Sequence, residues 1–141
     1  MLRPINVLLV EDNEADAFLT TETLAMSKLR IDITVLADGA LALAYLLQEP
    51  PYENAEIPEL ILLDLNLPKI DGAHLLAEIR GRETLRRIPV VVLTSSDAEQ
   101  DIIKSYDLGA NCYVTKPVGI ETFQSIVRSV EHFWFTIVRL P

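Results

Sequence analysis

The sequence has little cysteine, few basic residues and no long hydrophobic run, and each shortage excludes a class of protein. A single cysteine, Cys112, cannot form a disulfide within the 141-residue chain, which is typical of a reducing compartment. Only 12 Lys and Arg residues stand against 21 Asp and Glu, and the net charge of -9 argues against binding to nucleic acid or to an anionic membrane. No apolar run approaches the roughly 20 residues that span a bilayer.

The N-terminus also lacks the features of a signal peptide, because residues 1–6 lead at once into an apolar stretch that ends in acids. We therefore expect a cytoplasmic protein. Half of the residues are hydrophobic and the mean hydropathy is +0.25, so the chain can bury a core. Its length is that of one compact domain, and we expect residues 1–141 to form a single domain.

Five short apolar runs alternate with segments of helical periodicity. The runs are residues 7–10, 33–37, 60–63, 90–93 and 112–114. Helix starts are predicted after Asn13, Asp38 and Asp71, at the capping box of residues 96–99, and near residue 120 for a long final helix that ends near 140. The first helix has apolar positions at Phe18, Leu19, Leu24 and Met26. Continuous aliphatic strands are covered on both faces. The pattern therefore predicts an α/β fold, a flavodoxin-like (βα)5 three-layer sandwich with a parallel five-stranded sheet of order 2-1-3-4-5.

Polar side chains follow the carboxyl ends of four of these strands. They are Glu11 and Asp12, Asp64, Thr94 and Ser95, and Thr115 and Lys116. In open α/β sheets the ligand site lies at the carboxyl ends of the strands, where the winding direction reverses. With the predicted strand order the reversal falls between the first and third strands, so Glu11, Asp12 and Asp64 should converge.

Three carboxylates at one end of an apolar sheet repel one another, and burial raises the cost of keeping them charged. A hard divalent cation such as Mg²⁺ resolves this, because it takes oxygen ligands and is typically held by one or two carboxylates plus a phosphate. Lys116 adds a fixed positive charge and Thr94 adds a hydroxyl donor. The set suits a tetrahedral dianion on or beside Asp64, and therefore phosphoryl transfer.

Four segments carry a family resemblance: VLLVEDNEAD, LILLDLNLPKIDG, IPVVVLTSSDAE and GANCYVTKPV. They resemble the signature segments of the response regulator receiver domain of two-component signalling, over residues 5 to about 131. The resemblance implies that Asp64 takes a phosphoryl group from a phosphohistidine on a sensor histidine kinase. Such a chain is a signalling protein, not an enzyme acting on a separate substrate, although it takes part in its own phosphorylation and dephosphorylation.

The resemblance also implies a role for each matching residue. Glu11, Asp12, Asp64 and the Asn66 backbone carbonyl would hold Mg²⁺, with Mn²⁺ as a substitute; Thr94 and Lys116 would act on the phosphoryl group; Thr94 and Tyr113 would be the switch residues. The Lys116–Pro117 bond would be cis. Glu11 stands where many members have Asp, and Leu67 replaces a frequent Met.

The last third of the chain, with TSSDAEQDIIKSYDLGANCYVTKPV and FWFTIV, is similar to single-domain regulators that partner bacterial phytochromes. This resemblance implies light signalling, a phytochrome-type kinase and a homodimer. The final helix continues past Val130 with an apolar cluster that no further element would cover, and such patches mark interfaces. The cluster is Phe133, Trp134, Ile137 and Val138. The alternative is that this tail folds back onto its own domain.

Two other functions compete with the phosphoacceptor hypothesis. A haloacid-dehalogenase-like phosphatase also uses an Asp nucleophile at a strand end with Lys and Mg²⁺, but it needs a second Asp two residues later, where this chain has Asn66. The other alternative is a binding module that keeps the fold and is never phosphorylated. The presence of a full residue set argues against this module: Asp12, Asp64, Thr94 and Lys116.

Overall fold

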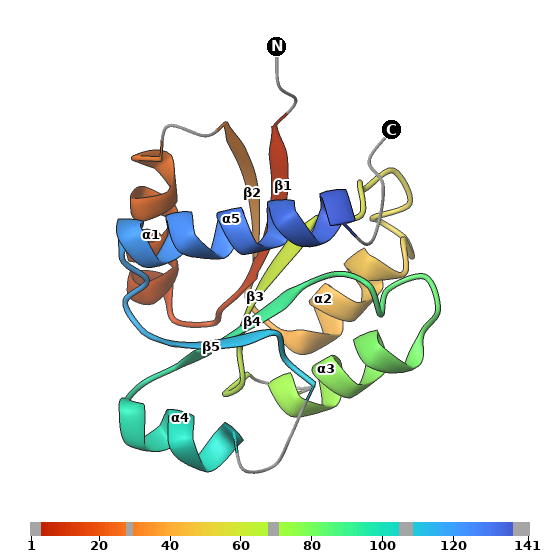
Figure 1. Ribbon diagram of the computed structural model, residues 1–141. Coiled ribbons are helices and arrows are strands. Elements are labelled where there is room, and N and C mark those ends of the chain that lie inside the picture. Colours follow the sequence, from red (N-terminus) through yellow and green to blue (C-terminus); the bar gives the residue numbers. More distant parts are fainter. Residues whose placement is uncertain (1–3, 28–29, 68–70, 105–108, 137–141) are drawn as a thin grey trace.

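The structure, a computed structural model, describes residues 4–27, 30–67, 71–104 and 109–136, with residue 104 and residues 130–136 described by their backbone alone (Figure 1). The strands are β1 (Ile5–Val10), β2 (Ile31–Leu36), β3 (Leu60–Asp64), β4 (Val90–Thr94) and β5 (Cys112–Thr115). The helices are α1 (Glu14–Ala25), α2 (Gly39–Leu46), α3 (Gly72–Gly81), α4 (Asp97–Lys104) and α5 (Ile120–Thr136). All neighbouring strands are parallel, in the order β2-β1-β3-β4-β5, which confirms the predicted fold.

Helices cover the sheet on both faces, with α1 and α5 on one side and α2 and α3 on the other (Figure 1). Alternate strand residues belong to two separate hydrophobic clusters: Leu8 of β1 packs under α2 and α3, whereas Leu9 packs under α1 and α5. All five residues of β3 and all five of β4 are buried. This double burial explains why these strands are continuously aliphatic instead of alternating with polar residues.

The helix starts follow the predicted capping residues. The side-chain oxygen of Asn13 accepts the Asp16 N–H at 2.9 Å, and Asp71 accepts the N–H of His74 at 2.8 Å. Ser96 Oγ accepts the N–H of Glu99 at 3.1 Å, as the capping box predicts. Because these caps fix where each helix begins, they also fix the turns between the carboxyl ends of the strands and the helices.

Most of the apolar positions named for the first helix do not belong to its buried face. Phe18 is 61% exposed, Leu19 50% and Met26 71%, whereas Leu24 is buried with Ala17 and Thr20. Residues 17, 20 and 24 are spaced by three and four, so they share one helix face, and residues 18, 19 and 26 fall outside it. Small side chains at 17 and 20 form most of the buried face, which a count of apolar residues does not show.

The final helix is described as far as Thr136, close to the predicted range. Among the side chains of this helix that the structure describes, Phe123, Ile126 and Val127 are buried, all in its first half. Of the predicted interface residues, Phe133 and Trp134 lie in α5 with only their backbone described, and Ile137 and Val138 lie outside the described residues. Among the described residues, none of the helices has both the length and the apolar character needed to cross a membrane.

Candidate functional site

The ends of β1 and β3 bring three acidic side chains together. Val10 at the end of β1 pairs with Leu63, so Glu11, which follows β1, and Asp64, the last residue of β3, lie at neighbouring positions. Carboxylate oxygens of Glu11, Asp12 and Asp64 all lie within 4.8 Å of one another. Glu11 and Asp64 are buried and Asp12 is exposed, so the cluster opens to solvent on one side.

The backbone around Asp64 is fixed by a close approach of α3. Asp64 Oδ1 accepts the N–H of Asn66 at 2.9 Å, and the N–H of Gly72 donates to the carbonyl of Leu65 at 2.9 Å. A Cβ atom at residue 72 would lie 2.4 Å from Leu65 Cα and 2.6 Å from the Asp64 carbonyl oxygen. Only glycine fits there, so the start of α3 rests directly on the segment that carries Asp64.

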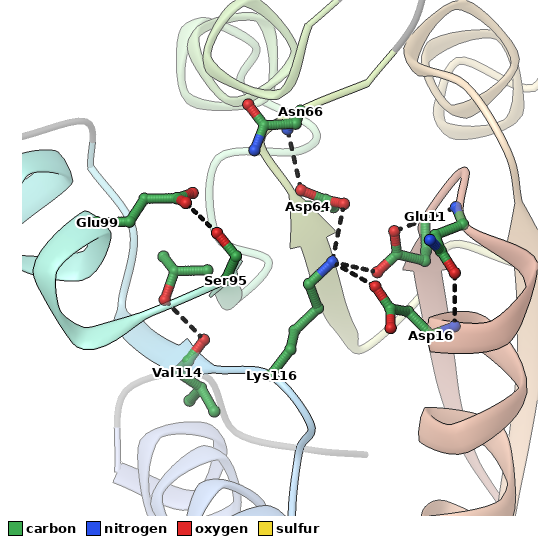
Figure 2. A network of polar contacts seen from close by, with 10 residues as sticks. Glu11, Asp16, Asp64, Asn66, Ser95, Glu99, Val114 and Lys116 are labelled. Carbon is green, nitrogen blue, oxygen red and sulfur yellow. Dashed lines mark hydrogen bonds and ion pairs between the residues drawn. The ribbon is translucent and has the colours of Figure 1, made fainter.

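Lys116, which follows β5, extends to the acidic cluster (Figure 2). Its Nζ lies 2.9 Å from Asp16 Oδ2, 3.1 Å from Glu11 Oε1 and 3.2 Å from Asp64 Oδ2. The side chain is 15% exposed, and its bond to Pro117 is cis, as the resemblance implies. An ammonium group has three donors, and all three are used by carboxylates from α1, β1 and β3.

Burial and charge together shift two pKa values at this site. Burial, with the neighbouring Asp64 carboxylate, raises the pKa of Glu11 from 4.5 to about 7 against the opposing effect of Lys116. Burial alone would lower the pKa of Lys116, but its bonds to Asp16 and Glu11 and the charge of Asp64 outweigh burial and raise it. Lys116 therefore stays protonated at neutral pH, while the buried acid beside it lacks a full counter-charge.

Thr94, Tyr113 and Asn66, the other residues with a predicted role, make separate contacts. The Thr94 side chain is buried, and its hydroxyl donates to the carbonyl of Val114 at 3.3 Å. Tyr113 packs partly buried against the cluster under α2 and α3. Asn66 contacts Asp64 through its N–H. The switch roles and the carbonyl ligand that the resemblance implies for these residues stay predictions.

Side chains of α4 are hydrogen-bonded to β5. The Thr115 hydroxyl donates to Asp97 Oδ1 at 2.7 Å, and Gln100 Nε2 donates to the Tyr113 carbonyl at 2.9 Å. The Ser95 hydroxyl also donates to Glu99 (Figure 2). These contacts join α4 to β5 and to the turn that follows β4.

Sequence reasoning missed one residue of this site, Asp16. An acid at this position favours the first turn of a helix, and the sequence predicts no role for it at the site, yet it is the nearest carboxylate to Lys116. The cap at Asn13 places residue 16 in the first turn of α1, near the ends of the strands. Its lysine partner lies 100 residues away in the chain, so local sequence gives no signal for the contact.

The donor set fits a hard divalent cation. All three clustered acids offer carboxylate oxygens, which Mg²⁺ and Mn²⁺ prefer, and the exposed Asp12 leaves a route for water ligands. Lys116 occupies only one oxygen each of Glu11 and Asp64. The other carboxylate oxygens therefore remain for a cation, whereas an anionic ligand has to compete with the carboxylates for the ammonium group.

Comparisons with known proteins agree with this geometry. The model of the response regulator receiver domain family matches residues 7–128. The response regulator Rcp1 of Synechocystis sp. (strain ATCC 27184 / PCC 6803 / Kazusa) is 49% identical over 138 residues, covering 98% of this chain and 94% of Rcp1.

Solved structures give the same result. The phosphorylated cyanobacterial phytochrome response regulator RcpA superposes with a TM-score of 0.76 at 50% identity, over 99% of both chains. The Mn²⁺-bound form of Rcp1 gives 0.74 at 48% identity, over 98% of this chain and 99% of the other. The bacteriophytochrome response regulator AtBRR gives 0.85 at 42% identity, over 94% and 96%.

Proposed function

We propose that Asp64 accepts a phosphoryl group in this chain, which belongs to the response regulator receiver domain family. The observation that carries the proposal is the position of the Lys116 ammonium, 3.2 Å from Asp64 Oδ2 and 3.1 Å from Glu11 Oε1. A buried carboxylate beside a fixed cation is a nucleophile whose product, a phosphorylated carboxylate, has a hydrogen-bond donor in place.

The reaction is a transfer between two residues. An Asp64 oxygen attacks the phosphorus of a phosphohistidine, the bond from phosphorus to the imidazole nitrogen breaks, and that nitrogen keeps the electron pair. Lys116 donates to a phosphoryl oxygen and so meets charge that develops there. The acid chemistry of a haloacid-dehalogenase-like phosphatase does not apply, because family membership overturns that alternative and residue 66 is Asn.

A divalent cation fits this reaction because the three clustered acids supply its ligands. Glu11, Asp12 and Asp64 would hold Mg²⁺, with the Asn66 carbonyl as a further ligand and Mn²⁺ as a substitute. When bound, the cation neutralises charge on the phosphoryl oxygens. The Mn²⁺-bound structure of Rcp1 supports this assignment.

Phosphorylation adds roughly two negative charges beside Thr94. The Thr94 hydroxyl leaves the Val114 carbonyl for a phosphoryl oxygen, and the ties from α4 to β5 carry the shift outward. Tyr113 moves inward, and the surface formed by β4, β5, α4 and α5 changes the partners it binds. This is a shift of population between two states, set by the contacts of Thr94 in each.

The phosphodonor is a sensor histidine kinase of the phytochrome type, in the cytoplasm. RcpA is named as a phytochrome response regulator and AtBRR as a bacteriophytochrome response regulator, and both match over nearly the whole chain. Light signalling is therefore the physiological setting that the similar structures support.

Phosphorylation is tested with acetyl phosphate and Mg²⁺, read by intact mass. We expect one phosphoryl adduct on the wild type and none on Asp64→Asn, while Asp101→Asn, an exposed acid on α4, keeps the adduct. An adduct that survives Asp64→Asn contradicts the assignment of Asp64. A wild type without any adduct favours the binding module that is never phosphorylated.

The chain forms a homodimer through the end of α5, a helix that continues to Thr136 and whose described buried side chains, Phe123, Ile126 and Val127, lie near its start. The apolar cluster Phe133, Trp134, Ile137 and Val138 is then covered by a second copy. Sedimentation of a chain truncated after Val130 tests this proposal. A monomer supports it, and a dimer of unchanged affinity rules it out.

A further inference from the structure

Asp16 makes the shortest contact of the Lys116 ammonium, at 2.9 Å, and differs from the other two acceptors in its surroundings (Figure 2). Its side chain is 36% exposed, against 0% for Glu11 and 7% for Asp64. It comes from α1, and it does not belong to the acidic cluster that fits a cation. A cation at that cluster would therefore draw on Glu11 and Asp64 but leave Asp16 on the ammonium.

All three donors of Lys116 are engaged before a phosphoryl group arrives. A phosphoryl oxygen therefore competes with these carboxylates for the ammonium, and Asp16 is the competitor that a cation at the acidic cluster does not draw on. The Asp16 carboxylate also contacts the same ammonium group as Asp64, so its negative charge lies close to Asp64. This charge repels an anionic phosphodonor. The bond to Asp16 is moreover the leading cause that raises the pKa of Lys116.

We propose that Asp16 is a positioning residue that holds the Lys116 ammonium against α1 and restrains phosphorylation of Asp64 by competing with the incoming phosphoryl oxygen. The inference rests on the proposed function of Asp64. The inference goes beyond the proposed function because Asp16, the residue that controls the reaction rate, is neither the phosphoacceptor nor a cation ligand.

The variant Asp16→Asn keeps the size of the side chain and removes its charge. We expect phosphorylation by acetyl phosphate to be about fivefold faster, and Mg²⁺ binding, measured by titration calorimetry, to be about fivefold weaker, as expected for one unit charge at a few ångströms in a high effective dielectric. The two effects have opposite directions. A variant that only disturbs the fold would lower both the rate and the affinity, and that result would overturn the proposal.

Glu14→Gln is the matched control, because Glu14 is an exposed acid on the same turn of α1. It loses the same charge at a position that makes no described contact with Lys116. We expect its rate and affinity to stay within twofold of the wild type. Equal effects of Asp16→Asn and Glu14→Gln would show a general charge effect and overturn the positioning role.

A second readout needs neither phosphodonor nor metal. In a ¹H–¹⁵N spectrum of lysine side chains, a firmly held ammonium group exchanges its protons slowly and gives a signal at neutral pH. We expect this signal for Lys116 in the wild type and in Glu14→Gln, and its loss in Asp16→Asn. A signal that is unchanged in Asp16→Asn overturns the proposal. Failure of the wild type to phosphorylate would instead count against Asp64 and leave this spectral test standing.

Discussion

Both ends of the parallel sheet carry acidic side chains, but the two groups differ in burial and in what neutralises them. At the carboxyl end, the Glu11 and Asp64 side chains are 0% and 7% exposed and share the ammonium of Lys116. At the amino end, Asn6 donates from its side chain to Glu56 and from its backbone to Glu59. Glu56 is exposed, and it lines a hollow of ≈ 240 Å³ with Asn6, Asp32, Thr34, Tyr45 and neighbouring residues.

The difference shows that burial, and not the number of acids, makes a reactive site. An exposed carboxylate keeps its charge at little cost, because water solvates it, so Glu56 needs only a neutral amide as partner. A buried carboxylate must gain a cation or a proton. Glu11 gains each of these partly: it shares the Lys116 cation with other acids, and its pKa is raised to about 7, which favours the protonated form. Of these two acidic groups, the one at the carboxyl end is therefore incompletely neutralised, and a metal ion can supply the missing positive charge.

The largest effect on this comparison should come from Lys116→Met, which keeps most of the chain length and removes the cation. We expect phosphorylation of Asp64 by acetyl phosphate to fall by about 10²- to 10³-fold, the range seen when one preorganised donor to a transition state is lost. The rate is measured by intact mass over time. Glu56→Gln, which neutralises an acid at the amino end, should leave the rate unchanged; a Lys116→Met rate within a few fold of wild type would show that the ammonium is dispensable.

A smaller effect is expected from Gly72→Ala, which tests the close packing of α3 against the backbone that carries Asp64. The added Cβ would meet the backbone of Asp64 and Leu65 at 2.6 and 2.4 Å, so the start of α3 must shift. We expect a loss of about 1–3 kcal/mol in the free energy of unfolding, typical of overpacking, measured by urea denaturation. Gly81→Ala, at the other end of α3 with no atom within 4 Å of a new Cβ, is the control and should be neutral or stabilising. Equal losses in both variants would contradict the close approach at Gly72.

The strands and their order could be predicted because double burial leaves a strong local signal. The runs 60–63 and 90–93 correspond to β3 and β4 within one residue, since every position in them contacts one of two cores. The helix starts could be predicted because caps act within three residues, as Asn13 does. The aliphatic runs and the helix caps both involve residues that are close together in the chain, so both can be recognised in the sequence.

Contacts between distant segments could not be predicted in the same way. The aliphatic and aromatic side chains of α1 gave no indication that Ala17 and Thr20, rather than Phe18, face the core, because the choice depends on what packs opposite. Asp16 could be placed on a helix but not beside Lys116, since that contact depends on how the loop after β5 turns. The acids at the strand ends were foreseen to converge only because parallel strands bring their carboxyl ends to one edge.

The smallest of these effects is a pH dependence that only the carboxyl end should show. The pKa of Glu11 in the folded chain, about 7, lies above its ordinary value of 4.5, so between these values the folded state binds more protons than the unfolded state. The free energy of unfolding of the metal-free chain should therefore fall as the pH rises from 4.5 to 7. A cation needs the ionised carboxylate, so its apparent affinity should instead increase with pH and level off above 7.

Between pH 6 and pH 8 the gain in Mg²⁺ affinity should be about tenfold, because the ionised fraction of a group with a pKa near 7 rises by that factor. Titration calorimetry at the two pH values measures it. Glu11→Gln keeps an oxygen ligand but cannot titrate, so its affinity should be lower and nearly independent of pH over this range. Glu56→Gln at the amino end should keep the full dependence, because Glu56 does not belong to the acidic cluster that fits the cation. A wild type whose affinity does not change with pH would mean that Glu11 is ionised throughout, and the two ends of the sheet would then differ only in the presence of Lys116.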